Sequence, residues 1–490
     1  MTVENERSEA ADDFHPHSKR EAMKSFWGMY EETPTVESMM LNKDAGSISC
    51  DDLNDILQVL PPLAGKRVVE LGAGIGRFTE PLAKDAADLL TTDFIPSFIE
   101  ENQRAHGHLT NVRYEVVDAM SLNLPPQSVD FVFTNWLMMY LTHQETVRFL
   151  RHCLRWLTPG GLMHIRESCS EPSSKHKKKD TMDNPTFYRH VSQYLALLDG
   201  LRLENEDGSG KSWAFRVRWA SSVHTYIRAN RNWRQCHAVL EKVEVAAGEA
   251  KSMEELAGLV GDVSWAAQEA ADAAFQAKLE LLGGLASSPL QDWLLELPEL
   301  EETKLGDAGG LLAIFPQPDL ASVLLQALAK EQHHQVYGLE TDALHFSSQL
   351  GLANRLGNVN AQFKWVPSLS EDCTDWAIPG TFDVILAACL LEPIDSQERS
   401  CIISNLACLA SNVGCLISLE PSEEDGWKQF TLRDVSAEIR QILQGCLDSI
   451  SIEGEESKAG DALRKNWAAA LQKYKHWTLL RVECSSPVSP

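Results

Sequence analysis

Short apolar runs alternate with amphipathic stretches through the first third of the chain. The helical spacing of Leu53, Ile56 and Leu60 ends at a Pro-Pro pair, because proline cannot continue a helix. A second helical pattern covers residues 144–156. Strand-like runs lie between and after these patterns, at 67–71, 88–92, 112–117, 129–134 and 162–165. Strands that alternate with helices predict an α/β fold with a doubly wound parallel sheet.

The second half of the chain repeats this pattern after an interruption. Residues 245–300 are rich in Ala, Glu and Leu, which predicts linking helices. Strand-like runs then return at 309–315, 336–340, 382–386 and 415–419. The strings around Asp130 and Ile165 resemble those around Asp383 and Ser418, and the separation within each pair is 35 positions. We therefore expect the second half to be a divergent copy of the first.

The copy has lost the glycine-rich turn that follows the first strand. Residues Glu70 to Gly76 read Glu-Leu-Gly-Ala-Gly-Ile-Gly, whereas Ala313 to Asp319 read Ala-Ile-Phe-Pro-Gln-Pro-Asp. Side chains and two prolines would keep a ligand away from the backbone there. The second half is therefore expected to fold without binding a nucleotide.

Charge and cysteine content narrow the class of protein. The 490 residues include 44 Lys plus Arg and 70 Asp plus Glu, a formal charge of −26, which disfavours nucleic acid as a partner. No run of 18 apolar residues is present, so no membrane span is expected, and the N-terminus lacks the apolar core of a secretory signal. The 11 Cys contain no Cys-x-x-Cys pair, which favours a reducing cytoplasm and disfavours a Cys-rich zinc site.

The glycine turn is the main candidate for a ligand site. Gly72, Gly74 and Gly76 follow a predicted strand, and ligands of open α/β sheets bind at the carboxyl ends of strands. Asp93 and Asp118 follow the second and third strands. An acid after the second strand suits two ribose hydroxyls and would repel the ribose phosphate of NADP. A purely structural turn, with each Asp as a cap or turn residue, is the competing explanation.

This combination resembles the class I S-adenosylmethionine-dependent methyltransferases. The resemblance implies that the glycine turn holds the methionine part of the cofactor, the strand-two acid its ribose and the strand-three Asp its adenine. A dehydrogenase is the main competitor, but nothing downstream resembles a dehydrogenase substrate domain.

Five longer strings resemble the first methyltransferase domain of the phosphoethanolamine N-methyltransferases of plants and nematodes. These strings are residues 35–41, 70–79, 135–141, 166–169 and 184–189. The bipartite chain, and Leu-Arg-Lys-Asn-Trp at 463–467, resemble the nematode type with an active N-terminal domain. The resemblance implies methyl transfer from S-adenosylmethionine to phosphoethanolamine, giving phospho-monomethylethanolamine and S-adenosylhomocysteine. This product leads to phosphocholine and phosphatidylcholine.

The resemblance also implies a domain plan and a cofactor site. The plan is a polar tail at 1–19, a catalytic methyltransferase domain at 20–244, a helical linker at 245–305 and a degenerate methyltransferase-like domain at 306–490. The expected cofactor-binding residues are Gly72, Gly74, Arg77, Asp93, Phe94, Asp118, Ala119 and Asn135. No metal is expected, because no ligand cluster accompanies the motifs.

The acceptor site needs groups that bind a phosphate and present an unprotonated amine. Arginine suits phosphate through its fixed fork of donors, and an aromatic face suits a cationic amine. The expected substrate-binding residues are Trp27, Arg166, Tyr188, Arg189 and Tyr194. Tyr140 stands where related single-domain enzymes carry a His, so Tyr140 and Tyr30 are the catalytic candidates. Since an unperturbed Tyr is a poor base at neutral pH, we expect Tyr140 to hydrogen-bond the amine.

Two other functions stay open on the sequence alone. The chain could be a non-catalytic regulatory subunit with a methyltransferase fold, although the glycine turn and both aspartates favour an active enzyme. It could also methylate another small acceptor, such as a sterol or a quinone. The polar 166–194 stretch favours an anionic acceptor. A monomer is our expectation for the oligomeric state.

Overall fold

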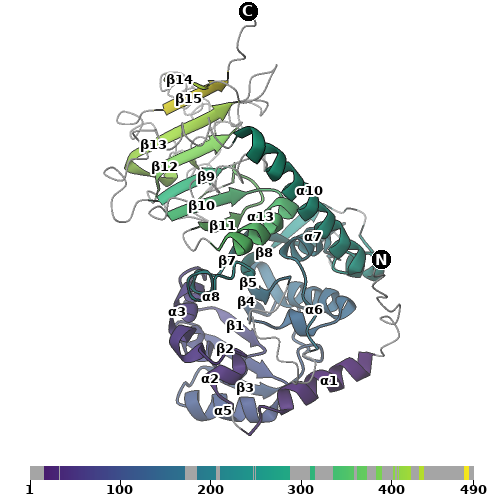
Figure 1. The fold of residues 1–490 in the computed structure, drawn as a ribbon. Helices are drawn as coiled ribbons and strands as arrows, with labels where there is room; N and C mark the ends of the chain where they lie inside the picture. Colours follow the sequence, from purple (N-terminus) through teal and green to yellow (C-terminus); the bar gives the residue numbers. More distant parts are fainter. Residues whose placement is uncertain are drawn as a thin grey trace, which may run out of the picture. The chain divides into compact units, whose positions relative to one another are not determined.

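The computed structural model describes two compact units of the chain (Figure 1). The described residues are 16–32, 34–170, 185–205, 210–246, 248, 250–286, 310–314, 335–357, 361–371, 373, 382–388, 401–402, 405–406, 408–420, 430–434 and 479–484. The first unit comprises residues 1–189, 197–216 and 239–262, and the second comprises 190–196, 217–238 and 263–490. The predicted tail up to residue 15, the turn at 315–319 and the 463–467 string lie outside the described residues.

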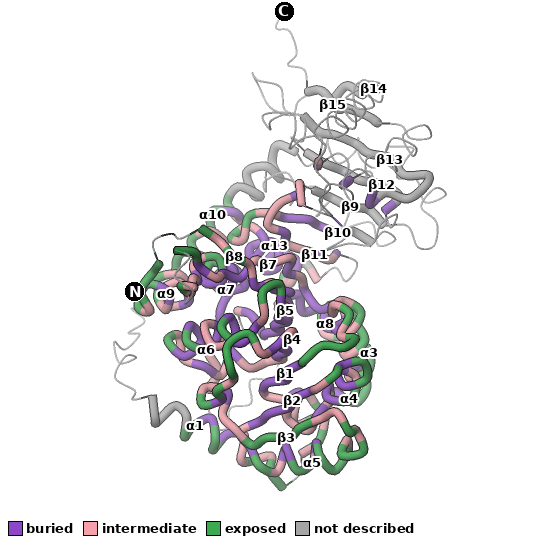
Figure 2. Tube along the Cα trace, turned by 180° about the vertical axis from the view of Figure 1, so that it is seen from behind, coloured by how far each residue is buried: buried purple, intermediate pink, exposed green. Residues whose placement is uncertain are grey.

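The first unit is built on five parallel strands in the order β3-β2-β1-β4-β5. Their bounds are β1 (Arg67–Leu71), β2 (Asp88–Asp93), β3 (Val112–Val116), β4 (Val129–Thr134) and β5 (Leu157–Ser168). All five strands predicted from the sequence are confirmed, and the fifth is longer than expected. Figure 2 shows that β1, β2, β4 and β5 are largely buried, as expected for the central strands of a parallel sheet.

Helices of the first unit lie before, between and after these strands. They are α1 (Pro16–Gly28), α2 (Val36–Met39), α3 (Ala45–Leu57), α4 (Thr79–Ala83), α5 (Pro96–His106), the short 3₁₀ helix η1 (Met138–Tyr140), α6 (His143–Trp156) and α9 (Met253–Gly258). A capping box between Thr142 and Glu145 begins α6, because the two side chains satisfy each other's backbone N–H groups. The predicted helix at 144–156 is thereby confirmed.

One apolar core joins two helices to the sheet of the first unit. Ile56 of α3 and Leu82 of α4 are fully buried, together with Val68, Leu89 and Phe131 of the central strands. Burial of apolar side chains is the main favourable contribution to folding. The core therefore holds the strands in register and fixes the carboxyl ends of β1, β2 and β4 beside one another.

In the second unit, the strands that follow residue 309 are hydrogen-bonded in the order β11-β10-β9-β12-β13-β15-β14. These strands are β9 (Gly310–Ile314), β10 (Gln335–Glu340), β11 (Ala361–Trp365), β12 (Phe382–Ala388), β13 (Ala410–Glu420), β14 (Phe430–Asp434) and β15 (Leu479–Cys484). Among them, β9 to β13 repeat the strand order and the parallel pairing of β1 to β5. The predicted divergent copy is therefore confirmed by topology.

All but one of the remaining elements lie between the two sets of strands in the sequence, and α13 lies between β10 and β11. Residues of α7 (Val191–Gly200), β7 (Lys211–Ser222) and β8 (Gln235–Ala246) are divided between the two units. The short strand β6 (Arg202–Glu204) pairs with β7, and α8 (His224–Asn230), α10 (Asp262–Ala286) and α13 (Ala343–Leu356) complete the described elements. The predicted linking helices are found as α9 and α10, whereas residues 287–300 lie outside the described residues.

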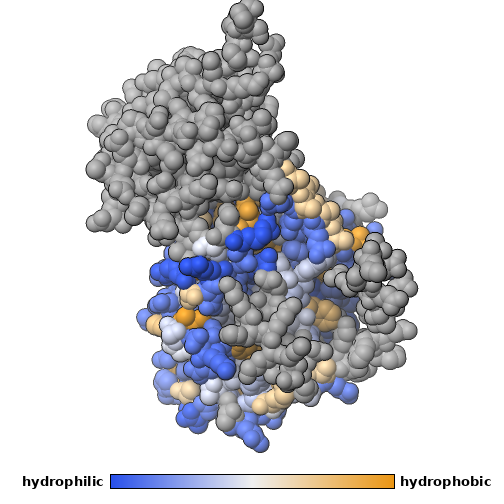
Figure 3. Space-filling model, viewed as in Figure 1, coloured by the Kyte–Doolittle hydropathy of each residue, from blue (hydrophilic) through white to orange (hydrophobic). Residues whose placement is uncertain are grey.

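The described surface of the first unit is mainly polar (Figure 3). In the view of Figure 3, the described surface of the first unit is mostly hydrophilic, with scattered apolar residues. None of the helices in the described ranges combines the length and the apolar character needed to cross a lipid bilayer.

Candidate functional site

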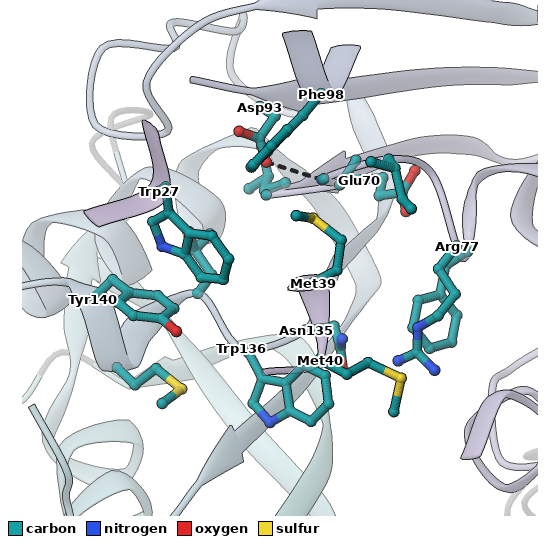
Figure 4. A pocket seen from close by; sticks show the side chains of 18 of the residues that line it. Trp27, Met39, Met40, Glu70, Arg77, Asp93, Phe98, Asn135, Trp136 and Tyr140 are labelled. Atoms are coloured by element: carbon teal, nitrogen blue, oxygen red, sulfur yellow. Dashed lines mark hydrogen bonds between the residues drawn. The ribbon is translucent and has the colours of Figure 1, made fainter. Parts of the chain in front are cut away.

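A cavity opens at the carboxyl ends of the strands in the first unit (Figure 4). This is the edge where open α/β sheets bind their ligands. The following residues line it: Trp27, Met39, Met40, Leu41, Glu70, Leu71, Gly72, Ala73, Gly74, Ile75, Arg77, Phe78, Asp93, Phe94, Phe98, Phe133, Asn135, Trp136, Leu137, Met139, Tyr140, Ser168 and Tyr188.

The glycine turn presents bare backbone to this cavity. Gly72, Gly74 and Gly76 have φ angles of +70°, +56° and +87°, a region that glycine adopts without steric cost. A Cβ on Gly72 would lie 3.2 Å from Leu137 Cδ1, and one on Gly74 would lie 3.0 Å from Met39 Sδ. Side chains at these positions would therefore crowd the residues that form the opposite wall.

Asp93 ends β2 and is fixed in place by backbone groups. Its Oδ2 accepts a hydrogen bond of 2.9 Å from the Gly74 N–H, and its Oδ1 accepts one of 3.0 Å from the Ile95 N–H. Burial raises the pKa of Asp93 to about 6, although the backbone N–H groups oppose that rise. A carboxylate has about four acceptor positions, so the side chain can still accept a bond from a ligand.

Glu70 lies below the turn and belongs to a buried hydroxyl network. Its Oε2 accepts hydrogen bonds from Thr79 Oγ1 at 2.6 Å and from Thr91 Oγ1 at 2.9 Å. Asn102 Nδ2 donates to both hydroxyls, at 2.9 and 3.2 Å. Desolvation raises the pKa of Glu70 to about 7. The network braces the strand end from which the glycine turn begins.

A buried group of charged side chains lies behind Arg77 and Asn135, which line the cavity. Asp52 is fully buried, and its carboxylate accepts from Arg77 Nη1 at 2.6 Å and from Arg166 Nη2 at 3.0 Å. Arg166 Nη1 also donates to Asn135 Oδ1 at 2.9 Å. Two guanidinium groups therefore share one carboxylate.

Arg166 also holds an unusual backbone conformation at Trp136. The φ angle of Trp136 is +57°, which is rare for a bulky residue and marks local strain. The Trp136 N–H donates to the Arg166 carbonyl at 2.7 Å, and the Arg166 guanidinium lies 3.5 Å from the centre of the indole ring. Backbone and ring contacts together hold Trp136 against the cavity.

The other end of the cavity is aromatic. Trp27 of α1 makes an edge-on contact with Tyr140 at 5.4 Å between ring centres, and Figure 4 shows both on the side opposite Arg77. Burial raises the pKa of Tyr140 far above its ordinary value, and Tyr140 and Tyr188 each share a hydrogen bond with Thr186. Tyr140 therefore stays protonated at neutral pH, so its hydroxyl can donate a hydrogen bond.

The structure brings most of the predicted site residues into one cavity. The lining includes the predicted residues Trp27, Gly72, Gly74, Arg77, Asp93, Phe94, Asn135, Tyr140 and Tyr188. The lining does not include the predicted residues Tyr30, Asp118, Ala119, Arg166, Arg189 and Tyr194.

These six residues have other surroundings. Tyr30 packs against Phe26 and Trp27, with 5.8 Å between ring centres in each pair. Asp118 caps its own turn by accepting from the Met120 N–H at 2.9 Å, and its neighbour Ala119 is buried. Tyr194 belongs to the second unit. Arg166 and Arg189 are fully buried, and their guanidinium groups bond to protein acceptors.

The sequence analysis did not identify Asp52, although the sequence carries a signal for it. Ile48, Asp52 and Ile56 recur every four residues and are all buried on one face of α3. A carboxylate at an apolar position of an amphipathic helix indicates a buried charged partner. Within the described residues, no group of three His, Cys, Asp or Glu side chains could hold a metal ion.

Comparison with known proteins adds independent evidence. A family model described as a methyltransferase domain matches residues 68–161. The chain is 35% identical over 467 residues to phosphoethanolamine N-methyltransferase 1 of Caenorhabditis elegans, and the match covers 92% of this chain and 94% of that protein. Phosphoethanolamine N-methyltransferase 3 of Arabidopsis thaliana is 36% identical over 227 residues, which cover 46% of this chain and 45% of the plant protein.

A solved structure agrees with the nematode match. Phosphoethanolamine N-methyltransferase 1 of Haemonchus contortus, in complex with phosphoethanolamine and S-adenosylhomocysteine, is 33% identical and superposes with a TM-score of 0.72. The superposition covers 91% of this chain and 97% of the solved chain. The similarity to the nematode proteins therefore extends through both halves of the chain.

Proposed function

The chain belongs to the phosphoethanolamine N-methyltransferase family, and we propose that the cavity of its first unit is where the family's reaction takes place. The fold is that of a class I S-adenosylmethionine-dependent methyltransferase, followed by a degenerate second copy. The enzyme transfers a methyl group from S-adenosylmethionine to the amine of phosphoethanolamine, giving phospho-monomethylethanolamine. This is the first step towards phosphocholine.

The contact between Asp93 and the glycine turn is the observation that carries this assignment to the cavity. Asp93 is held by the N–H groups of Gly74 and Ile95, so that its remaining acceptor positions suit two ribose hydroxyls. The positive φ angles at Gly72 and Gly74 leave room for the methionine part beside the backbone. Arg77 lines the cavity, and its guanidinium group suits the carboxylate of the methionine part.

The aromatic end of the cavity suits the acceptor amine. S-adenosylmethionine supplies an activated methyl group on a positively charged sulfur. Apolar walls disfavour a charged ammonium and so favour the neutral amine that has a lone pair. Trp27 and Tyr140 offer ring faces that stabilise positive charge as it moves to the amine nitrogen, and the protonated Tyr140 hydroxyl can orient that nitrogen.

Tyr188 and Ser168 are our candidates for the phosphate end. Both line the cavity, Tyr188 lies near Tyr140, and both carry hydroxyls that can donate to phosphate oxygens. The sequence-based candidates Arg166, Arg189 and Tyr194 are not assigned to the phosphate, since none of them is among the lining residues. Tyr30 packs against Trp27, and Asp118 with Ala119 remain our candidates for the adenine end of the cofactor.

Methyl transfer from labelled S-adenosylmethionine tests this function. Phosphoethanolamine, phospho-monomethylethanolamine and phospho-dimethylethanolamine would be offered in parallel, with free ethanolamine as the control that lacks the phosphate. We expect turnover of phosphoethanolamine and none of ethanolamine. Absence of turnover with all three phosphorylated acceptors would contradict the proposal.

The second unit is proposed to have no cofactor site of its own. Glu340 ends β10, at the place that Asp93 takes in β2. Its carboxylate accepts from the Thr341 and Asp342 N–H groups at 2.9 and 3.1 Å and from Gln349 Nε2 at 2.9 Å. The glycine turn that faces Asp93 has no counterpart here, because residues 313–319 read Ala-Ile-Phe-Pro-Gln-Pro-Asp. Equilibrium dialysis should detect one bound S-adenosylhomocysteine per chain, and two would contradict the proposal.

Cytoplasmic location and a monomeric state complete the proposal. Cys50, Cys153 and Cys236 are not in disulfide bonds, which is typical of a reducing compartment. Cell fractionation and light scattering of the purified protein test these two points.

A further inference from the structure

The turn that carries Tyr140 has little hydrogen bonding of its own. Leu137, Met139 and Tyr140 all line the cavity, and η1 spans only Met138–Tyr140. Two backbone bonds close the turn, from Tyr140 N to Leu137 O at 3.0 Å and from Leu141 N to Met138 O at 3.0 Å. The other N–H and carbonyl groups of such a short helix need partners from elsewhere.

Glu167 supplies the partners of the N–H groups. Its side chain is buried, and its Oε1 accepts from the N–H groups of Leu137 at 3.3 Å and Met138 at 2.8 Å. Its Oε2 accepts from the Met139 N–H at 3.0 Å. One carboxylate thus satisfies three successive donors at the start of the turn.

Arg189 supplies the partners of the carbonyl groups. Its guanidinium donates from Nη1 to Met138 O at 3.0 Å and from Nη2 to Leu141 O at 2.7 Å. Arg189 is fully buried. The turn therefore lies between a carboxylate on its N–H side and a guanidinium on its carbonyl side, and such charge-assisted bonds are stronger than neutral ones.

The same two residues connect the turn with the other segments of the acceptor end. Glu167 directly precedes Ser168, and Arg189 directly follows Tyr188; Ser168 and Tyr188 both line the cavity. The Ser170 N–H donates to the Arg189 carbonyl at 2.9 Å, and the Phe187 N–H donates to the Met139 carbonyl at 2.7 Å. A shift of either charged side chain would therefore move several cavity residues together.

We propose that Glu167 and Arg189 are positioning residues, which fix Tyr140 relative to Tyr188 and Ser168 without touching the substrate. This inference rests on the proposed function of the cavity. It gives Arg189 a role different from phosphate binding, and it gives Glu167 a role in the reaction. Thr186, which bonds to both tyrosine hydroxyls, completes the arrangement.

Kinetics of Glu167→Gln, Arg189→Lys and Arg189→Met test the proposal. Gln keeps the shape of Glu but replaces one acceptor oxygen by an NH₂ donor that faces a backbone N–H. We expect kcat for phosphoethanolamine to fall by about tenfold to a hundredfold, since displacement by about 1 Å has effects of this size. The Kd of S-adenosylhomocysteine should change by less than about threefold, because the Asp93 and Gly74 contacts remain.

The two arginine variants separate the charge from the packing. Lys keeps a cation that can donate to one carbonyl, whereas Met has similar length and no donor. We expect kcat to decrease in the order wild type, Arg189→Lys, Arg189→Met. Glu101→Gln and Arg104→Lys are matched controls, because this pair lies on the surface of α5; both should keep wild-type kinetics.

Each outcome bears on the proposal. Unchanged kcat in Glu167→Gln would overturn it, and so would parallel losses of thermal stability, cofactor affinity and activity, which indicate a merely structural role. If these variants do not fold, Thr186→Val removes only the shared hydroxyl, and a kcat equal to that of wild type would overturn the proposal. An inactive wild type would instead contradict the proposed function, and the positioning role would fall with it.

Discussion

The carboxylate of Asp93 accepts a hydrogen bond of 2.9 Å from the backbone N–H of Gly74, which lies 19 residues earlier in the chain. This bond joins the end of β2 to the middle of the turn that follows β1. A ligand that lies on the turn therefore meets a carboxylate of fixed orientation. Cofactor binding should depend on both the charge and the second oxygen of this side chain.

Asp93→Asn should weaken cofactor binding selectively. The amide keeps one acceptor oxygen but turns an NH₂ group towards a backbone N–H that Asp93 now satisfies. We expect the Kd of S-adenosylhomocysteine to rise by about tenfold or more, which corresponds to about 1.4 kcal/mol, with a smaller change in the KM for phosphoethanolamine. Calorimetric titration measures the Kd. Asp88→Asn, at the exposed start of the same strand, is the control, and equal effects of the two changes would contradict the expectation.

Asp52→Asn should destabilise the first unit. Asp52 is the shared partner of Arg77 and Arg166, and removal of one member of a buried ion pair costs about 3–5 kcal/mol because a charge is left without compensation. We expect a lower unfolding temperature and weaker S-adenosylhomocysteine binding, measured by thermal denaturation and titration. The neighbouring Asp51 is exposed, so Asp51→Asn should leave both quantities unchanged. Similar unfolding temperatures of the two variants would show that the ion pairs of Asp52 with Arg77 and Arg166 contribute little to stability.

Gly76→Ala should lower the free energy of unfolding more than Gly160→Ala, although both glycines have a positive φ angle. Gly76 has a φ of +87°, and a Cβ there would lie 2.2 Å from Asn102 Oδ1, whereas Gly160 at +71° has no atom within 4 Å. Gly160→Ala should therefore cost only the conformational term of about 1–2 kcal/mol. Gly76→Ala adds steric strain of about 1–3 kcal/mol. Urea denaturation compares the two variants, and equal losses would contradict the predicted clash.

Glu70→Gln should change how stability depends on pH. Burial raises the pKa of Glu70 from 4.5 to about 7, so its stabilising contribution is fully present below about pH 4.5 and is lost as pH rises through about 7. The amide is not ionised, but its oxygen can still accept from Thr79 and Thr91. The stability of the variant relative to wild type should therefore increase from pH 5 to pH 8, as measured by thermal denaturation. The exposed Glu100→Gln is the control, and a pH-independent difference for Glu70→Gln would contradict the assignment.

The amino-acid sequence by itself determined the strands, their alternation with helices and the duplication. These features depend on local patterns. The strand at 67–71 carries the apolar residues that a parallel sheet buries. Gly72, Gly74 and Gly76 give a turn that adopts positive φ without steric cost. The ordered glycine turn and strand-end acids also sufficed to place Asp93 beside the turn, because carboxyl ends of neighbouring parallel strands meet at one edge.

Only the tertiary structure decided which charged side chains face the cavity and which support it. Arg77 and Arg166 both lie near the carboxyl end of a predicted strand. In the structure, Arg77 lines the cavity, whereas Arg166 is buried against Asp52, Asn135 and Trp136. Arg189 was predicted as a phosphate ligand from its place next to Tyr188, but its guanidinium donates to the carbonyls of η1. The residue type sets the length and the charge of a side chain. The partners that compensate a buried charge come from segments that are distant in the chain, so the local sequence does not show them.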